Sequence, residues 1–142
     1  MRFSSRTRHA LCLMIELAAN ADSGFMSLKE ISWRDNVSLK YMEQIMSSLK
    51  KAGLIVSTRG ARGGYRLARL PRLITAGDII RVTEGTFSTG ADEPDVNEVG
   101  CSVTAAFFDD LQQILEHYLD SVSLEKLREA ADRNLSEPEY SI

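Results

Sequence analysis

Between two strand-like segments lies a run of arginines and glycines, and this run constrains the fold of the chain more than any other feature. Residues 59–69 read RGARGGYRLAR, with four arginines and three glycines. The apolar and β-branched segment LIVST precedes the run at 54–58, and YRLAR at 65–69 reads as a second strand. We therefore predict a β-hairpin. Its loop suits contact with phosphate, because glycine lets a backbone approach closely and arginine donates a fork of N–H groups.

The spacing of the glycines separates this loop from nucleotide-binding loops. Those loops need GxxxxGK followed by Ser or Thr and a helix, or GxGxxG between a strand and a helix. Gly60, Gly63 and Gly64 fit neither spacing, and a strand is expected after them. The segment GARG also matches the GxxG of RNA-clamping KH domains, but that loop joins two helices. The favoured interpretation is a hairpin loop whose arginines grip a DNA duplex.

Two capped helices are predicted directly before the hairpin. Ser27 and Glu30 have the spacing of a capping box and begin a short helix over 28–34. Ser38 can cap a second helix over 39–51. Two short helices joined by a tight turn form a helix-turn-helix, and the hairpin after them makes the unit a winged helix. The expected fold class is mainly α with a small β-hairpin.

The second of these helices is amphipathic. A stripe predicted to be buried is formed by Leu39, Met42, Met46 and Leu49. The opposite face carries hydrogen-bonding groups and two cations, on Lys40, Tyr41, Gln44, Ser47, Ser48 and Lys51, with Glu43 at its flank. Such a face suits the major groove of DNA, where a glutamine can pair with adenine.

Two more helices are expected in the same part of the chain. One covers 7–20 at helical apolar spacing, with Cys12 expected in the core. The other covers 75–85 and is capped by Thr75. Together with the helix-turn-helix and the hairpin, they complete a predicted DNA-binding domain over 1–84.

A linker and a helical region are predicted after this domain. Residues 85–100 are rich in Gly, Asp, Glu and Thr and lack periodicity, so a linker or sensor loop is expected. A long helix over 102–121 and a last helix from near Ser123 form a helical dimerisation region over 101–142. The long helix carries an apolar stripe of Val103, Phe107, Leu111, Ile114 and Tyr118. A twin helix from a second copy would bury this stripe, and packing on the same subunit is the alternative.

The charge of the chain is divided between its halves. Residues 1–72 carry 13 Lys and Arg against 5 Asp and Glu, and 73–142 carry 4 against 15, so the net charge of −3 hides halves of +8 and −11. The basic half suits a polyanionic partner. No apolar run is long enough to span a membrane, and Glu16 interrupts the run that a signal peptide would need. Two widely separated cysteines form no disulfide framework, which fits a cytoplasmic protein.

Four segments together carry a resemblance to a known family. They are MRFSSRTRHAL, ISWRDNVSLKYMEQIMSSLKKAGLI, STRGARGGYRLAR and TAGDIIRVTEG. They resemble the IscR/NsrR/CymR family of bacterial winged-helix transcription regulators, over nearly the whole chain and most strongly over 1–86. The resemblance implies a homodimer joined by the long helix. It also implies a recognition helix in the major groove of double-stranded DNA and the hairpin, or wing, in the adjacent minor groove.

The resemblance further implies which residues contact DNA. Those expected at bases or their sugars are Ser38, Tyr41, Glu43 and Gln44. Those expected in the minor groove are Arg59, Gly60 and Arg62, and those expected at the DNA backbone are Ser5, Arg6, Lys40 and Tyr65. The implied function is a DNA-binding transcription regulator, a repressor that binds a pseudo-palindromic operator.

The cysteines decide which branch of the family is favoured. Many members hold an iron–sulfur cluster with three cysteines just before the long helix. This chain has only Cys101 in that region, which disfavours a cluster. It resembles instead the cluster-free CymR-like branch, whose members repress sulfur and cysteine metabolism and can work with a cysteine-synthesis enzyme. Cys101 stands at the start of a helix, where the dipole favours thiolate, so it is a candidate redox sensor; a partly buried spectator is the alternative.

Two other functions remain open at this stage. One is an iron–sulfur or thiol-redox sensing regulator of the same family. The other is a protein-interaction module that binds an enzyme through its acidic half and no longer binds an operator. An enzyme has little support, because no nucleophile and base are paired and Asp109 and Asp110 lie on different sides of one helix.

Overall fold

The computed structural model describes residues 2–31, 37–86 and 99–136, with side chains from 102 to 134 in the last segment. These residues form six α-helices, two short 3-10 helices and one two-stranded antiparallel sheet. The elements are α1 (Ser5–Ala19), η1 (Ala21–Ser23), α2 (Leu28–Ile31), α3 (Leu39–Lys51), β1 (Ile55–Thr58), β2 (Gly64–Leu67), η2 (Pro71–Leu73), α4 (Ala76–Glu84), α5 (Val99–Ser121) and α6 (Leu124–Ser136). The mainly helical chain with one small hairpin agrees with the predicted fold class.

The main core lies where α1, α3, α4 and α6 meet against the base of the hairpin. Its large side chains that are almost fully removed from solvent are Met14, Ile45, Met46, Leu49, Ile55, Ile74, Ile79 and Leu124. Burying one such side chain stabilises the fold by roughly 1.5–3 kcal/mol. Leu124 comes from α6, so the last described helix packs into the same core as the helix-turn-helix.

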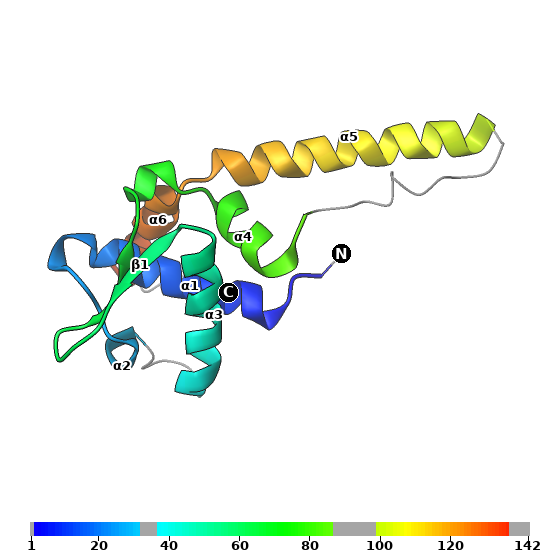
Figure 1. The fold of residues 1–142 in the computed structure, drawn as a ribbon. Helices are drawn as coiled ribbons and strands as arrows, with labels where there is room; N and C mark the ends of the chain where they lie inside the picture. The colour runs from blue at the N-terminus through cyan, green and yellow to red at the C-terminus, as the bar shows by residue number, and fades with distance from the viewer. Residues whose placement is uncertain (1, 32–36, 87–98, 137–142) are drawn as a thin grey trace.

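Two residues that were predicted to be buried are exposed instead. Leu39 is 41% exposed, because it is the first residue of α3 and that end of the helix extends beyond the core (Figure 1). Cys12 is exposed as well, because the buried side of α1 is formed by its neighbours Ala10, Leu13 and Met14. Both predictions of burial were wrong.

The hairpin keeps a regular register and is anchored at its base. Ile55 pairs with Leu67, and Thr58 pairs with Gly64. The backbones of Met26 and Tyr65 exchange two hydrogen bonds of 2.8 Å each, so the segment before α2 is joined to β2. Gly64 allows this close approach, because a Cβ there would lie 2.1 Å from the carbonyl oxygen of Met26.

The predicted caps are present at three helix starts. The Ser27 backbone N–H donates to Glu30 at 2.9 Å, and the Glu30 N–H donates to the Ser27 hydroxyl at 3.4 Å. Ser38 accepts from the backbone of Tyr41 at 3.1 Å. Thr75 begins α4 as a full capping box with Asp78. The predicted extension of the first helix of the pair to residue 34, and the turn after it, lie outside the described residues.

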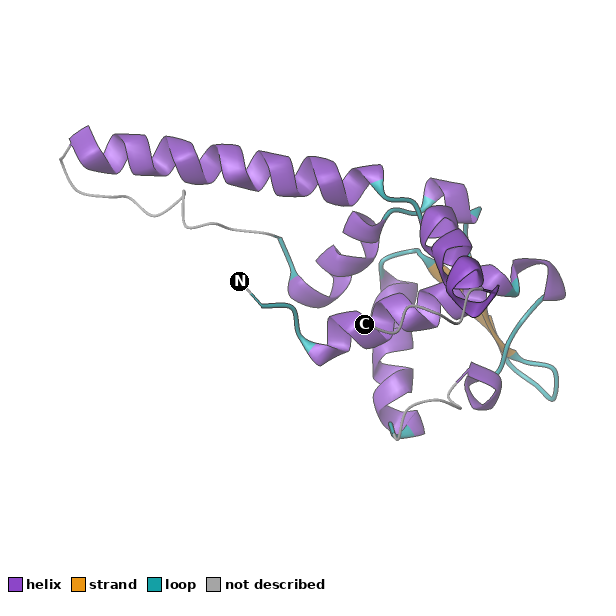
Figure 2. Ribbon diagram, turned by 180° about the vertical axis from the view of Figure 1, so that it is seen from behind, coloured by secondary structure: helices purple, strands orange, loops and turns teal. Residues whose placement is uncertain are grey.

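Helix α5 projects from the rest of the molecule as an arm. Figures 1 and 2 place the N-terminal end of α5 and the hairpin at opposite ends of the molecule. Its C-terminal end packs on α4, where Leu119 is buried. Farther out, four large apolar side chains are between 62% and 67% exposed, namely Val103, Phe107, Ile114 and Tyr118. Packing on the same subunit therefore does not cover these four residues.

None of the helices in the described part of the chain has the length and apolar character needed to cross a membrane.

Candidate nucleic-acid interface

The predicted contact residues of α3 lie on its solvent-facing side. Lys40, Glu43 and Gln44 are exposed, and so is Ser38 at the N-cap. They stand opposite the buried residues of the same helix, as the amphipathic pattern predicts. In Figure 1 the N-terminal end of α3 and the loop of the hairpin both lie at the lower side of the molecule. The fold thus brings the two predicted DNA-contact regions to one side.

Tyr41 is held from the side by a residue of α1. Its hydroxyl lies 3.1 Å from Nδ1 of His9, and the two rings meet edge to face with centroids 5.6 Å apart. Tyr41 is half-buried, so only part of its ring faces solvent. His9 thereby fixes the direction of a side chain that we predict to contact bases. The sequence contained no signal for this pair, because the two residues are 32 positions apart.

Arg6 also reaches α3. Its Nη2 donates to the Ser48 hydroxyl at 2.9 Å, and that hydroxyl donates to the carbonyl oxygen of Gln44 at 3.2 Å. The guanidinium therefore ties α1 to the helix that carries Gln44. Ser5, by contrast, is exposed at the first position of α1. The prediction that Arg6 and Ser5 contact the DNA backbone stays a prediction.

The tip of the hairpin presents its arginines to solvent. Arg59 and Arg62 are exposed, and Gly60 between them has φ +111°, which L side chains rarely adopt. The N–H of Gly63 closes the loop by donating to Gly60 at 2.9 Å. Arg66, in contrast, lies over the ring of Phe25 at 4.7 Å, in a cation–π contact on the strand.

Tyr65 links the hairpin electrostatically to α3. It is half-buried in β2, and burial raises the pKa of its hydroxyl, with a smaller contribution from the negative charge of Glu43. The ordinary pKa of a tyrosine is 10.0 and this one is higher, so the hydroxyl is protonated at neutral pH and can donate a hydrogen bond. Such a donor is suited to a phosphate oxygen.

Glu84 joins the end of α4 to the start of α1. Its carboxylate accepts hydrogen bonds from the backbone N–H of Ser4 at 2.7 Å, from the Ser4 hydroxyl at 2.9 Å and from the hydroxyl of Thr7. Thr7 is only 1% exposed. The hydrogen bond from Thr7, followed by those from Ser4, lowers the pKa of Glu84. This network orients the N-terminal segment that contains Ser5 and Arg6.

Replacing Glu84 with glutamine should destabilise the protein at neutral pH and lose its effect in acid. The folded pKa of Glu84 is below its ordinary value of 4.5, so the stabilising contribution is present above 4.5 and disappears as the pH falls through the folded pKa. Thermal unfolding midpoints of the parent and Glu84→Gln should differ at neutral pH and converge in acid. Glu125→Gln, at an exposed carboxylate of α6, is the control. A difference that stays constant with pH would contradict this role.

Comparison with known proteins gives a consistent result. The Rrf2 family, described as an iron-dependent transcriptional regulator, matches residues 3–130. The HTH-type transcriptional regulator CymR of Bacillus subtilis is 41% identical over 136 residues, covering 93% of each chain. The regulator IscR of Aliivibrio salmonicida is 36% identical over 129 residues, covering 89% of this chain and 77% of its own. The solved structure of B. subtilis CymR, described as the global cysteine regulator, has a TM-score of 0.77 at 39% identity, covering 92% of this chain and 98% of that one.

The helix-turn-helix, the hairpin and these relatives define the class of protein. It is a winged-helix DNA-binding transcription regulator and not an enzyme. The chain belongs to the Rrf2 family. The predicted family resemblance and the predicted general function are thus confirmed.

An iron–sulfur cluster, which the family implies, does not fit the donors of this chain. The sequence has two cysteines in all, Cys12 in α1 and Cys101 in α5. An iron–sulfur cluster is normally held by more cysteine thiolates than the two cysteines of one chain can supply. Within the part of the chain that the structure describes, no group of three or more His, Cys, Asp or Glu is arranged to hold a metal ion. The side chain of Cys101 lies outside the described residues, so its proposed redox role stays a prediction.

Proposed function

We propose that this protein is a homodimeric repressor that binds a pseudo-palindromic DNA operator. The observation that carries the proposal is the placement of two surfaces on one subunit. The polar face of α3 and the arginines at the tip of the hairpin lie on one side of the molecule, and α5 projects from it with a large exposed apolar surface. One surface suits DNA, and the other suits a second copy.

Each DNA-facing element has chemistry that matches a groove. In the major groove, the exposed amide of Gln44 can pair with the N6 and N7 edge of adenine. Glu43 can accept from the amino group of cytosine. Arg59 and Arg62 can enter a narrow minor groove, where the negative potential is strongest. Lys40 and Tyr65 supply donors for the phosphates on either side.

The apolar surface of α5 supports the proposed dimer. An isolated apolar patch is seldom left in water unless it is an interaction site. Phe107 and Phe108 meet edge to face at 5.6 Å and widen this surface, together with Val103, Ile114 and Tyr118. A second α5 offers the same apolar surface in return, as a two-fold axis requires. Two subunits then present two copies of α3 to two half-sites.

Operator binding should weaken steeply with salt. Each phosphate that is neutralised releases counterions, and six or more contacts reduce the affinity by about 10³-fold or more between about 50 and 200 mM salt. Gel shift or fluorescence anisotropy with a genomic operator fragment at several salt concentrations measures this slope. A flat salt dependence would contradict operator binding through the basic half and favour the protein-interaction module.

Genes of cysteine and sulfur metabolism are the proposed targets. The support is the similarity to B. subtilis CymR, which is described as the global cysteine regulator of that organism. A cysteine-synthesis enzyme is the proposed protein partner, and the acidic half is the surface we assign to it. Chromatin enrichment of the protein in its own host, followed by sequencing, tests the gene set. Co-purification of the enzyme tests the partner.

A further inference from the structure

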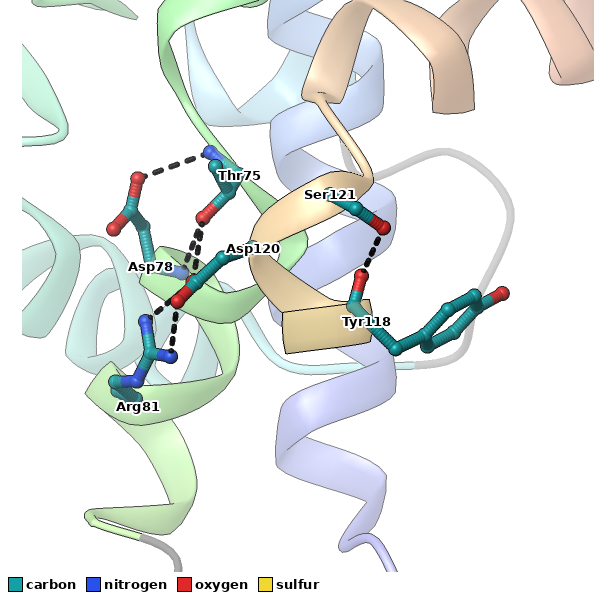
Figure 3. Close-up of polar contacts among 6 residues, drawn as sticks. All are labelled: Thr75, Asp78, Arg81, Tyr118, Asp120 and Ser121. Atoms are coloured by element: carbon teal, nitrogen blue, oxygen red, sulfur yellow. Dashed lines mark hydrogen bonds and ion pairs between the residues drawn. The ribbon is translucent and has the colours of Figure 1, made fainter. Parts of the chain in front are cut away.

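Outside the DNA-facing surface, a cluster of hydrogen-bonded polar groups lies where α5 meets α4. Figure 3 shows the carboxylate of Asp120 between the guanidinium of Arg81 and the hydroxyl of Thr75, while the ring of Tyr118 points away from this cluster. Arg81 donates to both oxygens of Asp120, at 2.8 and 3.0 Å. Thr75 approaches the same carboxylate at 3.5 Å. Thr75 also caps the start of α4. The Asp120 carboxylate, near the end of α5, is therefore contacted by the residue at which α4 begins.

Gly77 makes this junction a close steric fit. A Cβ at this position would lie 2.3 Å from Oδ1 of Asp120 and 2.9 Å from Nη1 of Arg81. Both atoms are the ends of side chains, so a Cβ at this position would displace the carboxylate and the guanidinium from each other. Gly77 therefore leaves room for the Arg81–Asp120 pair against the surface of α4.

Backbone hydrogen bonds also stabilise this junction. The N–H of Ala76 donates to Val122 at 2.8 Å, and the N–H of Leu124 donates to Ile74 at 2.7 Å. An apolar cluster at the same junction has three buried members, Ala76, Ile80 and Leu119. Helix α5 is therefore fixed to the winged helix at its C-terminal end, and its exposed apolar residues lie farther along the arm.

A small change of angle at this junction is amplified along α5. Phe107 is about 20 Å from Asp120 along the helix, at 1.5 Å per residue. A tilt of about 10° at the junction moves Phe107 by about 3.5 Å, which is close to the rise of one base pair. Two recognition helices in a dimer must match half-sites about 10–10.5 base pairs apart, or a multiple of that distance. The junction angle thus has the magnitude needed to change the accepted spacing by one base pair.

We propose that Gly77, Arg81 and Asp120 set the angle between α5 and the winged helix and thereby determine which operator spacing the dimer accepts. These three are positioning residues, which need no contact with DNA. The proposal rests on the proposed function, because spacing has meaning only for a dimer on two half-sites.

The exposure of the ion pair separates this role from a purely stabilising one. The side chains of Arg81 and Asp120 are 32% and 50% exposed. Exposed ion pairs contribute little to stability. The neutral variant Asp120→Asn should therefore stay folded and dimeric, and the angle between the two helices should change because only the backbone and apolar contacts then hold it.

The test is a panel of operators that differ only in the number of base pairs between half-sites. Binding of the full-length dimer to each operator, and to a single half-site, is measured by fluorescence anisotropy at one salt concentration. The parent should prefer one spacing. Asp120→Asn should shift that preference, or reduce the ratio between the best and the neighbouring spacing by at least about threefold, the lower range of coupling between contacting residues. Its binding to the single half-site should stay unchanged. Glu125→Gln is the charge-matched control.

A second pair of variants tests the steric part of the proposal. Gly77→Ala should shift the spacing preference, because its Cβ displaces the Asp120 carboxylate. In an Asp120→Ala background, the same Gly77→Ala change should have little further effect, since the nearest clashing atom is gone and the Arg81 guanidinium, no longer held by Asp120, can move aside.

The possible outcomes are distinct. An affinity of Asp120→Asn that falls equally at every spacing, or a preference identical to the parent's, would overturn the proposal. Additive effects of Gly77→Ala and Asp120→Ala would overturn its steric part. If the parent itself does not bind the operators, or binds all spacings as a monomer, the proposed function fails first, and sedimentation velocity identifies that case.

Discussion

Replacing Arg59 with alanine should weaken operator binding by about 1–3 kcal/mol, and Arg62→Ala should have a similar effect. Both side chains are exposed at the tip of the hairpin, on either side of the positive-φ Gly60. An arginine in a narrow minor groove gains from both its charge and the shape of the groove. Fluorescence anisotropy with the operator at constant salt gives the change in affinity. Circular dichroism checks that each variant is folded.

Arg69→Ala is the matched control for these two substitutions. It removes the same charge from an exposed position just after β2, away from the tip of the loop. We expect it to change the affinity much less. Equal losses for Arg59→Ala and Arg69→Ala would mean that general charge is recognised, without insertion into a groove. An unchanged affinity of Arg59→Ala would remove Arg59 from the interface altogether.

Placing aspartate at both Phe107 and Ile114 should convert the dimer to a monomer and reduce operator affinity by about 10²–10⁴-fold. Both residues are more than 60% exposed on α5. Two carboxylates brought against the same surface of a second subunit would be buried without partners, which is strongly unfavourable. A monomer binds one half-site at a time and loses the advantage of joined sites. Sedimentation velocity reports the assembly, and anisotropy reports the affinity.

Leu73→Asp is the control for this double substitution, because Leu73 is also more than half exposed but lies in η2. It should leave the dimer intact. The affinity of the α5 variant for a single half-site should also equal that of the parent, since α3 is unchanged. A variant that remains dimeric would show that the subunits associate through another surface.

The local features of the fold could be predicted because their signals lie close together in the sequence. The capping pair Ser27 and Glu30 is three residues apart, and Ser38 begins a helix whose observed range, Leu39–Lys51, is the predicted one. The hairpin follows from glycines and alternating residues within one segment. In such cases neighbouring residues decide the backbone conformation, so a single sequence contains enough information.

Contacts between distant segments could not be predicted in this way. His9 with Tyr41, Arg6 with Ser48, and Glu84 with Ser4 each join residues 32 to 80 positions apart. Nothing near any of these residues in the sequence indicates its partner. Leu39 shows a related limit, because periodicity predicts which side of a helix is apolar but not how far the core extends along it.

The junction between α4 and α5 combines both situations. Thr75 was recognised as a cap from its position before an apolar segment, and the structure adds Asp78 as its partner in the capping box. The role of Gly77 had no signal, because a glycine inside a helix usually weakens it. In the structure, the carboxylate of Asp120, 43 residues later in the chain, lies where a Cβ of residue 77 would be placed.

The double hydrogen bond between Met26 and Tyr65 has a consequence for how this hairpin can be engineered. Because the base of the wing is fixed to the segment before α2, strand register does not depend on the residues at the tip. Residues 59–62 can therefore be exchanged with those of a relative as a cassette, while Gly64 is kept to preserve the join. The residues at the tip then determine which groove shape is recognised, while the rest of the fold stays unchanged.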